Sequence, residues 1–120
     1  MNSLVLAYLG DAIYELRIRE FLINKGISKV NSLQNEAIKY TSAKGQSKFL
    51  EKLIDNNFFN DEELEIIYRA RNHKGNRHPK NTDILTYKHA TALEAVIGYL
   101  YINKRIDKIE QMIDFILKGE

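Results

Sequence analysis

The chain has 120 residues, the length of one domain, and no cysteine, which excludes disulfides, thiol nucleophiles and cysteine-based zinc sites. Its hydrophobic content of 44% and charged content of 28% are those of an ordinary soluble domain, and its net charge of +2 is too small to indicate a class of partner. No apolar run reaches the roughly 18 residues needed to span a bilayer, and the N-terminus lacks the basic region of a signal peptide, so we expect one cytoplasmic domain over residues 1–120 and no membrane partner.

The spacing of the apolar residues predicts the fold class. They recur at helical intervals, alternating β-branched runs are few, and Pro79 is the only proline. These patterns predict an all-α fold with about six helices. In chain order, the helices are expected at about Leu4 to Asn24, Asn31 to Tyr40, Ala43 to Asp55, Asn60 to Arg71 or Asn72, Asp83 to Ile102 and Ile106 to Lys118.

Helix-end signals support several of these boundaries. Gly26 follows the first helix as a stop signal, and Ser42 is a suitable N-cap for the third. Asn60 is followed three residues later by Glu63, which is a capping-box pattern for the fourth helix. The one clear loop covers residues 74–82 and precedes the fifth helix.

Two of the expected helices each contain an apolar stretch with a single acid. Asp11 is the only charge between Leu4 and Tyr14, and Glu94 is the only charge between Ala92 and Leu100. Helices that are apolar on nearly all sides are normally buried, and a buried lone carboxylate is costly unless it is paired or binds a metal. A shared divalent cation would resolve both cases, and Mg²⁺ prefers such oxygen ligands. The alternative is that each acid pairs with a basic side chain or faces solvent.

The same two helices each contain a glycine, Gly10 and Gly98. A glycine inside a helix costs about 1 kcal/mol relative to alanine, so it usually has a packing reason. Each glycine would allow the close approach of another helix, either at a dimer interface or in packing within the chain.

Positive charge is concentrated between Arg69 and Lys80, a segment with five Arg or Lys, two His and no acid. Lys88 and His89 extend this basic segment towards Glu94. Clusters of this kind bind phosphates, although a solvated loop without a partner is the alternative. A basic surface beside a carboxylate–metal site suits phosphodiester hydrolysis. The three histidines match no zinc pattern, and we expect them to face solvent or contact phosphate.

Several motifs resemble one known family. Leu6–Leu16 resembles the signature helix of the ribonuclease III family, and Thr91–Tyr101 is similar to that family's second metal-binding helix. Ser42–Ser47, and Arg69–Asn72 followed by Pro79–Asp83, look like the Mini-III branch in particular. The resemblance covers nearly the whole chain, and the motifs are specific in combination.

The resemblance implies a ribonuclease III-like domain of packed helices and a homodimer with a valley for double-stranded RNA. It implies Mg²⁺-dependent hydrolysis that leaves 5′-phosphate ends, without the separate RNA-binding domain of full-length ribonuclease III. In bacteria the Mini-III branch trims the ends of large-subunit (23S) ribosomal RNA precursors. Because this substrate is part of a ribosome precursor, we also expect a ribosomal protein or the pre-ribosome as a partner.

The resemblance also suggests the site residues. Ala7 and Thr91 stand where full-length ribonuclease III has acids, as in the Mini-III branch, so Asp11 and Glu94 remain as the catalytic residues and metal ligands. The number of metal ions stays open. Glu15, one helical turn after Asp11, is expected to pair with an arginine rather than contribute through a water.

The RNA contacts are expected from the basic segment. Lys74, Arg77 and Lys80 are expected to hold phosphates, with Arg71 and Lys88 assisting; Arg69 either assists or braces the helices. A non-catalytic domain that binds double-stranded RNA is the alternative function. A helical protein-interaction module is the third, and it predicts weak RNA association that does not depend on salt.

Overall fold

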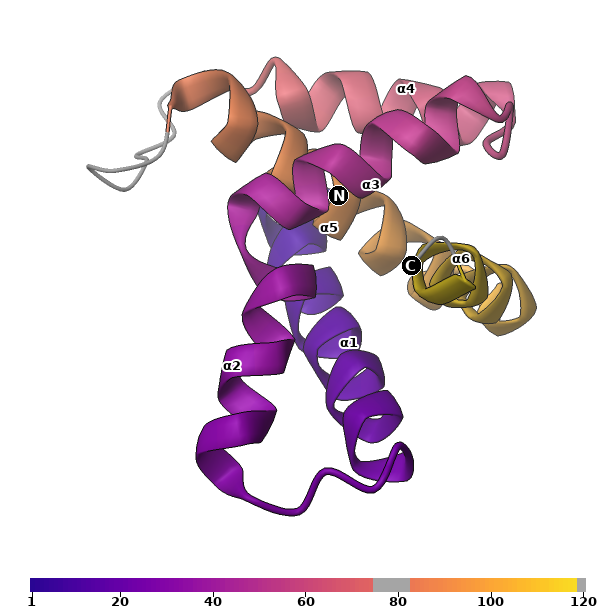
Figure 1. The fold of residues 1–120 in the computed structure, drawn as a ribbon. Helices are drawn as coiled ribbons and strands as arrows, with labels where there is room; N and C mark the ends of the chain where they lie inside the picture. Colours follow the sequence, from indigo (N-terminus) through magenta and orange to yellow (C-terminus); the bar gives the residue numbers. More distant parts are fainter. Residues whose placement is uncertain (75–82, 119–120) are drawn as a thin grey trace.

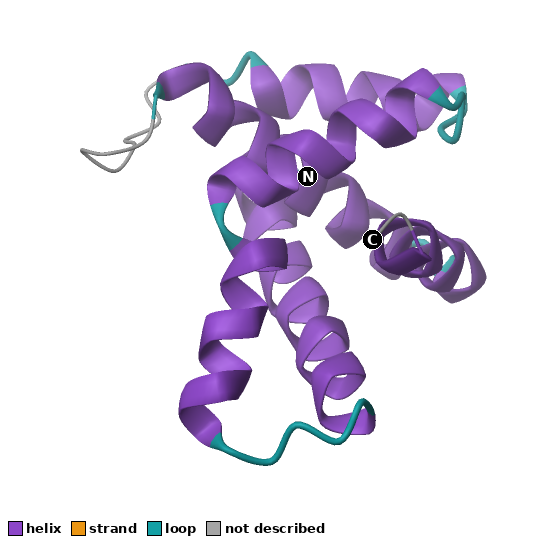
Figure 2. Ribbon diagram, viewed as in Figure 1, coloured by secondary structure: helices purple, strands orange, loops and turns teal. Residues whose placement is uncertain are grey.

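The computed structural model describes residues 1–74 and 83–118, and nearly all of these residues are helical (Figures 1 and 2). Neither range contains a strand, and no helix within them is long and apolar enough to cross a membrane. The described residues form six helices: α1 (Ser3–Asn24), α2 (Val30–Thr41), α3 (Ala43–Asp55), α4 (Asp61–Arg71), α5 (Ile84–Ile102) and α6 (Ile106–Lys118). The expected all-α fold and the number of helices are thus confirmed.

The helix-end signals in the sequence form the expected caps. The Ser42 side chain accepts a hydrogen bond of 3.1 Å from the Gly45 amide, which caps α3. The Asn60 side chain accepts from the Glu63 amide and the Glu63 carboxylate accepts from the Asn60 amide, both at 2.9 Å. This capping box satisfies two backbone amides at the start of α4 and fixes where that helix begins.

Helix α5 is the centre of the molecule. It packs against α1, α3 and α4, and Figure 1 shows it passing between these helices. From Ala90 to Leu100, every residue except Glu94 and Tyr99 is buried. An element covered on this many sides needs an almost continuous apolar sequence, which explains why α5 lacks the one-sided pattern of a surface helix.

The two glycines allow α1 and α5 to cross at very short range. A methyl group on Gly10 would collide with the backbone carbonyl of Glu94, and a methyl group on Gly98 would collide with the carbonyl of Leu6. Of the two expected roles for these glycines, the structure supports packing within the chain. The crossing brings the backbone next to Asp11 directly against the backbone of Glu94.

The expected burial of α1 on nearly all sides is wrong. One face of α1 is buried against the core, but the opposite face is open to solvent. Its exposed apolar side chains, with their exposed fractions, are Leu4 (38%), Val5 (53%), Tyr8 (85%), Leu16 (56%) and Ile23 (58%). The reason is that α1 lies at the edge of the bundle, where α5 and α2 cover one side only (Figure 1).

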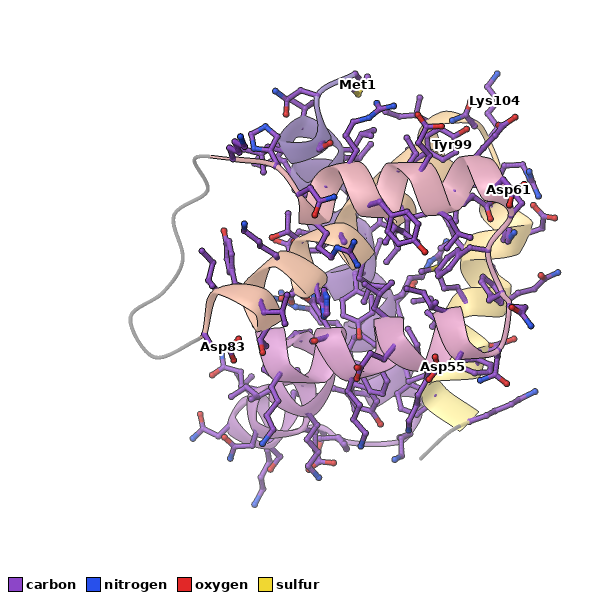
Figure 3. The ribbon with its side chains drawn as sticks, turned by 90° about the horizontal axis from the view of Figure 1, so that it is seen from above. Met1, Asp55, Asp61, Asp83, Tyr99 and Lys104 are labelled. Carbon is purple, nitrogen blue, oxygen red and sulfur yellow. The ribbon has the colours of Figure 1, made fainter. Side chains whose placement is uncertain are left out.

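Polar contacts connect α4 to its neighbours. Lys108 of α6 donates a 2.6 Å hydrogen bond to Glu63, whose side chain is 1% exposed. The Tyr99 hydroxyl of α5 donates to Glu62 at 3.2 Å, and Figure 3 shows Tyr99 close to α4, which begins at Asp61. Because breaking one partner of a buried ion pair leaves an uncompensated charge, the Lys108–Glu63 pair holds α6 in place.

Candidate active site

The crossing of α1 and α5 brings Asp11 and Glu94 together. Their carboxyl groups lie close enough for Asp11 to affect the pKa of Glu94, although the residues are far apart in the sequence. Gly10 precedes Asp11 and touches the backbone of Glu94, so the close helix crossing sets the separation of the two acids. Asp11 is exposed on the open side of α1, whereas Glu94 is half-buried on α5.

The environment of Glu94 disfavours its negative charge. Burial is the main cause, and the neighbouring Asp11 carboxyl adds to it, so that the pKa of Glu94 rises to about 8. A hydrogen bond from Gln46 opposes this shift. A cation between the two carboxylates would remove both the repulsion and the desolvation cost. The pair therefore fits a hard divalent cation such as Mg²⁺, which takes one or two carboxylates and fills its other positions with water or phosphate.

No third side chain completes a metal cluster among the described residues. Glu15 instead forms an ion pair with Arg19 at 3.4 Å, as expected. Ala7 and Thr91, which the resemblance places at acidic positions of full-length ribonuclease III, are both buried, and the Thr91 hydroxyl donates to the Tyr87 carbonyl at 3.0 Å. Among the described residues, the acidic side chains that meet at this crossing are thus Asp11 and Glu94.

The start of α3 contacts this site, which the sequence reasoning did not foresee. The Gln46 amide donates a 3.3 Å hydrogen bond to Glu94, and the Ser47 hydroxyl lies 3.3 Å from Nδ1 of His89. In the sequence, the motif Ser42–Ser47 is distinguished only by the family resemblance and by Ser42 as an N-cap. Its one local signal is the position of Gln46 one helical turn before the apolar residues Phe49 and Leu50, on the buried face of α3.

The basic residues expected to bind RNA are only partly described. Lys74 is exposed, Lys88 on α5 is half-buried, and the half-buried Arg71 places its guanidinium 4.9 Å from the centre of the Tyr68 ring. Two further expected contacts, Arg77 and Lys80, lie outside the described residues.

The remaining residues of the basic segment have other surroundings. Arg69 forms an ion pair with Glu65 at 3.1 Å along the same helix, which favours a bracing role. His73 and His89 are half-buried rather than fully open to solvent, and Nδ1 of His73 is buried with no hydrogen-bond partner among the described residues. His78 is outside the described residues.

Comparisons with known proteins identify the family of this chain. Residues 4–105 match the family model described as the ribonuclease III domain. The Mini-ribonuclease 3 of Brevibacillus brevis is 46% identical over 122 residues, which cover 99% of this chain and 90% of the relative. That of Staphylococcus aureus is 43% identical over 117 residues, covering 98% and 87%. A crystal structure of a Fusobacterium nucleatum protein superposes with a TM-score of 0.87 at 36% identity, covering 100% of this chain and 95% of that one. The chain therefore belongs to the ribonuclease III family, among the Mini-ribonuclease 3 proteins, and is an endoribonuclease.

Proposed function

We propose that Asp11 and Glu94 are the catalytic carboxylates and hold a divalent cation, Mg²⁺, with which the chain hydrolyses double-stranded RNA to 5′-phosphate ends. One observation carries the proposal: Asp11, the only acid of the apolar stretch 4–14 of α1, meets Glu94 of α5 at a crossing that two glycines allow to be close. When bound, the cation supplies Lewis-acid stabilisation of a phosphoryl oxygen and activation of water.

The chain's own residues bind and orient the substrate around this centre. Two carboxylates repel an RNA backbone, so nearby positive charge is needed to hold the phosphates. We assign this role to Lys74 and Lys88, together with Arg71, Arg77 and Lys80. Because A-form RNA is recognised mainly through shape, phosphates and 2′-hydroxyls, we expect little sequence preference.

We further propose that the active species is a homodimer formed through the exposed apolar stripe of α1. The stripe consists of Leu4, Val5, Tyr8, Leu16 and Ile23, all well exposed. Several exposed apolar side chains along one helix offer a surface for a partner, and a two-fold axis places the same patch of each copy against the other. Asp11 lies on the open side of the same helix, so the proposed interface and active site are neighbours.

The biological substrate is carried over from the family resemblance. We propose that the enzyme matures the ends of 23S ribosomal RNA precursor in the cytoplasm, with a ribosomal protein or the pre-ribosome presenting the substrate. A short stem copied from the precursor ends should then be cut at fixed positions, whereas an unrelated duplex should be cut at many.

The direct test is cleavage of a long double-stranded RNA with Mg²⁺ or with EDTA. The variants are Asp11→Asn and Glu94→Gln, and Glu15→Gln is the matched control because it removes a nearby acid that is already paired with Arg19. Loss of several kcal/mol of transition-state stabilisation predicts a decrease of at least about 10³-fold for each site variant. Glu15→Gln should remain close to wild type.

The alternatives predict different results. Site variants that retain full Mg²⁺-dependent cleavage would disprove the roles of Asp11 and Glu94. If the wild-type chain binds duplex RNA in a salt-sensitive manner but does not cut it with any divalent cation, the chain is a non-catalytic RNA-binding domain.

A further inference from the structure

The first turn of α3 is fixed tightly against the end of α2. A methyl group on Gly45 would collide with the carbonyl of Lys39, and the Gly45 amide donates to the N-cap Ser42. Only glycine permits this approach, so the backbone on either side of residue 45 has little freedom. The direction of the next side chain, Gln46, is thereby set by the α2–α3 junction.

Gln46 is 3% exposed and reaches across to α5. Its amide Nε2 lies 3.3 Å from Oε2 of Glu94 and donates to it. The adjacent Ser47 makes a second contact with α5, through His89, five residues before Glu94. Two successive residues of α3 thus contact the helix that carries the acid, and one of them contacts the carboxylate itself.

The chemistry of a glutamine differs from that of the other donors that could occupy this place. A lysine or arginine would hold the carboxylate but also neutralise it, and would compete with a cation for the same oxygens. A neutral amide holds one carboxylate oxygen and leaves the negative charge in place. Partners of this kind, which hold a ligand in the correct orientation, typically affect metal affinity by 10- to 100-fold when they are removed.

We propose that Gln46 is a positioning residue that orients the Glu94 carboxylate for a divalent cation. The inference rests on the metal-binding role proposed above for Glu94. This role explains the residue types of the Ser42–Ser47 segment. Ser42 caps α3, Gly45 permits the close junction with α2, and the Gln46 amide donates to Glu94.

The test measures Mn²⁺ binding to the full chain by titration calorimetry, together with the metal-free Tm. Gln46→Met keeps the size of the side chain and removes its donor, and Gln111→Met is the matched control because Gln111 is an exposed glutamine on α6. We expect Gln46→Met to bind Mn²⁺ about tenfold more weakly at nearly unchanged Tm. Gln111→Met should match wild type and Glu94→Gln should not bind. Raising Mg²⁺ should restore cleavage in Gln46→Met but not in Glu94→Gln.

Each outcome has a separate meaning. Wild-type Mn²⁺ affinity in a folded Gln46→Met variant overturns the role of Gln46 and leaves the metal assignment intact. A wild-type chain that binds no Mn²⁺ overturns the metal assignment, and this inference with it. If Gln46→Met does not fold, Gln46→Asn takes its place, since it keeps a polar amide but shortens its reach; weaker binding supports the proposal, and wild-type affinity overturns it.

Discussion

Helices α1 and α5 cross at two glycines and each contributes one acid, yet solvent reaches them very differently. Most of α5 between Ala90 and Leu100 is buried by three other helices. Helix α1 is buried on one side only, and Tyr8 on its other side is 85% exposed. An apolar side chain that the chain's own core does not cover is available to a partner. The buried side chains of α5 therefore stabilise the fold, whereas we propose that the exposed side chains of α1 form the dimer interface.

The same substitution in the two helices should give opposite results. Val96 of α5 is 0% exposed, so Val96→Asp buries an unpaired carboxylate and should unfold the chain, at a cost of several kcal/mol. Val5 of α1 is 53% exposed, so Val5→Asp should leave the helical circular dichroism unchanged and shift the mass measured by light scattering from dimer to monomer. A Val5→Asp variant that stays dimeric would refute the proposed interface, and one that unfolds would show that the α1 stripe belongs to the core.

The contact between the helices can be weakened without changing any charge. Gly98→Ala places a methyl group against the carbonyl of Leu6 and forces α1 and α5 apart. Overpacking of this kind should lower the free energy of unfolding by about 1–3 kcal/mol, partly offset by the better helix propensity of alanine. Urea denaturation measures the change. Gly26→Ala is a poor control because Gly26 has a φ of +93°, so the matched control is Ser32→Ala on the exposed face of α2.

Features of the fold that depend on short sequence patterns could be predicted, whereas the exposure of a helix could not. Ser42, Asn60 and Glu63 act through local hydrogen bonds, so their caps and the helix bounds were predictable from short-range patterns. The pairing of Asp11 with Glu94 was predictable because each is the lone acid of an apolar stretch, residues 4–14 and 92–100. The exposure of α1 was not, because an apolar helix at the edge of a bundle has the same composition as one at its centre.

The role of Gln46 was hidden for a different reason. Its partner is 48 positions away, and its direction depends on the contact of Gly45 with the end of α2. Neither relation appears in a hydrophobic period or a capping pattern. Residues that act through tertiary geometry of this kind are found only when the helices have been placed relative to one another.

Glu94 is less exposed than Asp11, and its burial should make the stability of the metal-free protein depend on pH. Because the pKa of Glu94 is about 8 in the folded chain and near 4.5 in the unfolded chain, the folded state holds a proton that the unfolded state has released between these values. The contribution of Glu94 to the free energy of unfolding should therefore be highest below about pH 4.5. It should fall as the pH rises towards 8. We expect a loss of at least about 1 kcal/mol, or roughly 4 °C in Tm.

Calorimetry of the metal-free chain at several pH values measures this effect. Glu94→Gln should remove the slope, and Asp11→Asn should reduce it because the Asp11 carboxyl contributes to the shift. Glu15→Gln is the control and should change it least. If the slope is identical in wild type and Glu94→Gln, another group is responsible.

The smallest expected effect lies where α5 emerges from the core. Lys88 is half-buried, just before the buried stretch that begins at Ala90, and we propose that it contacts phosphate. In a cleavage-deficient Glu94→Gln background, Lys88→Ala should weaken duplex binding modestly and reduce the slope of log K against log salt by about 1. Arg69→Ala provides the comparison, because Arg69 is already paired with Glu65 and should leave the slope unchanged. Equal slopes in the two variants would remove Lys88 from the RNA interface and confine the phosphate contacts to the basic segment before α5.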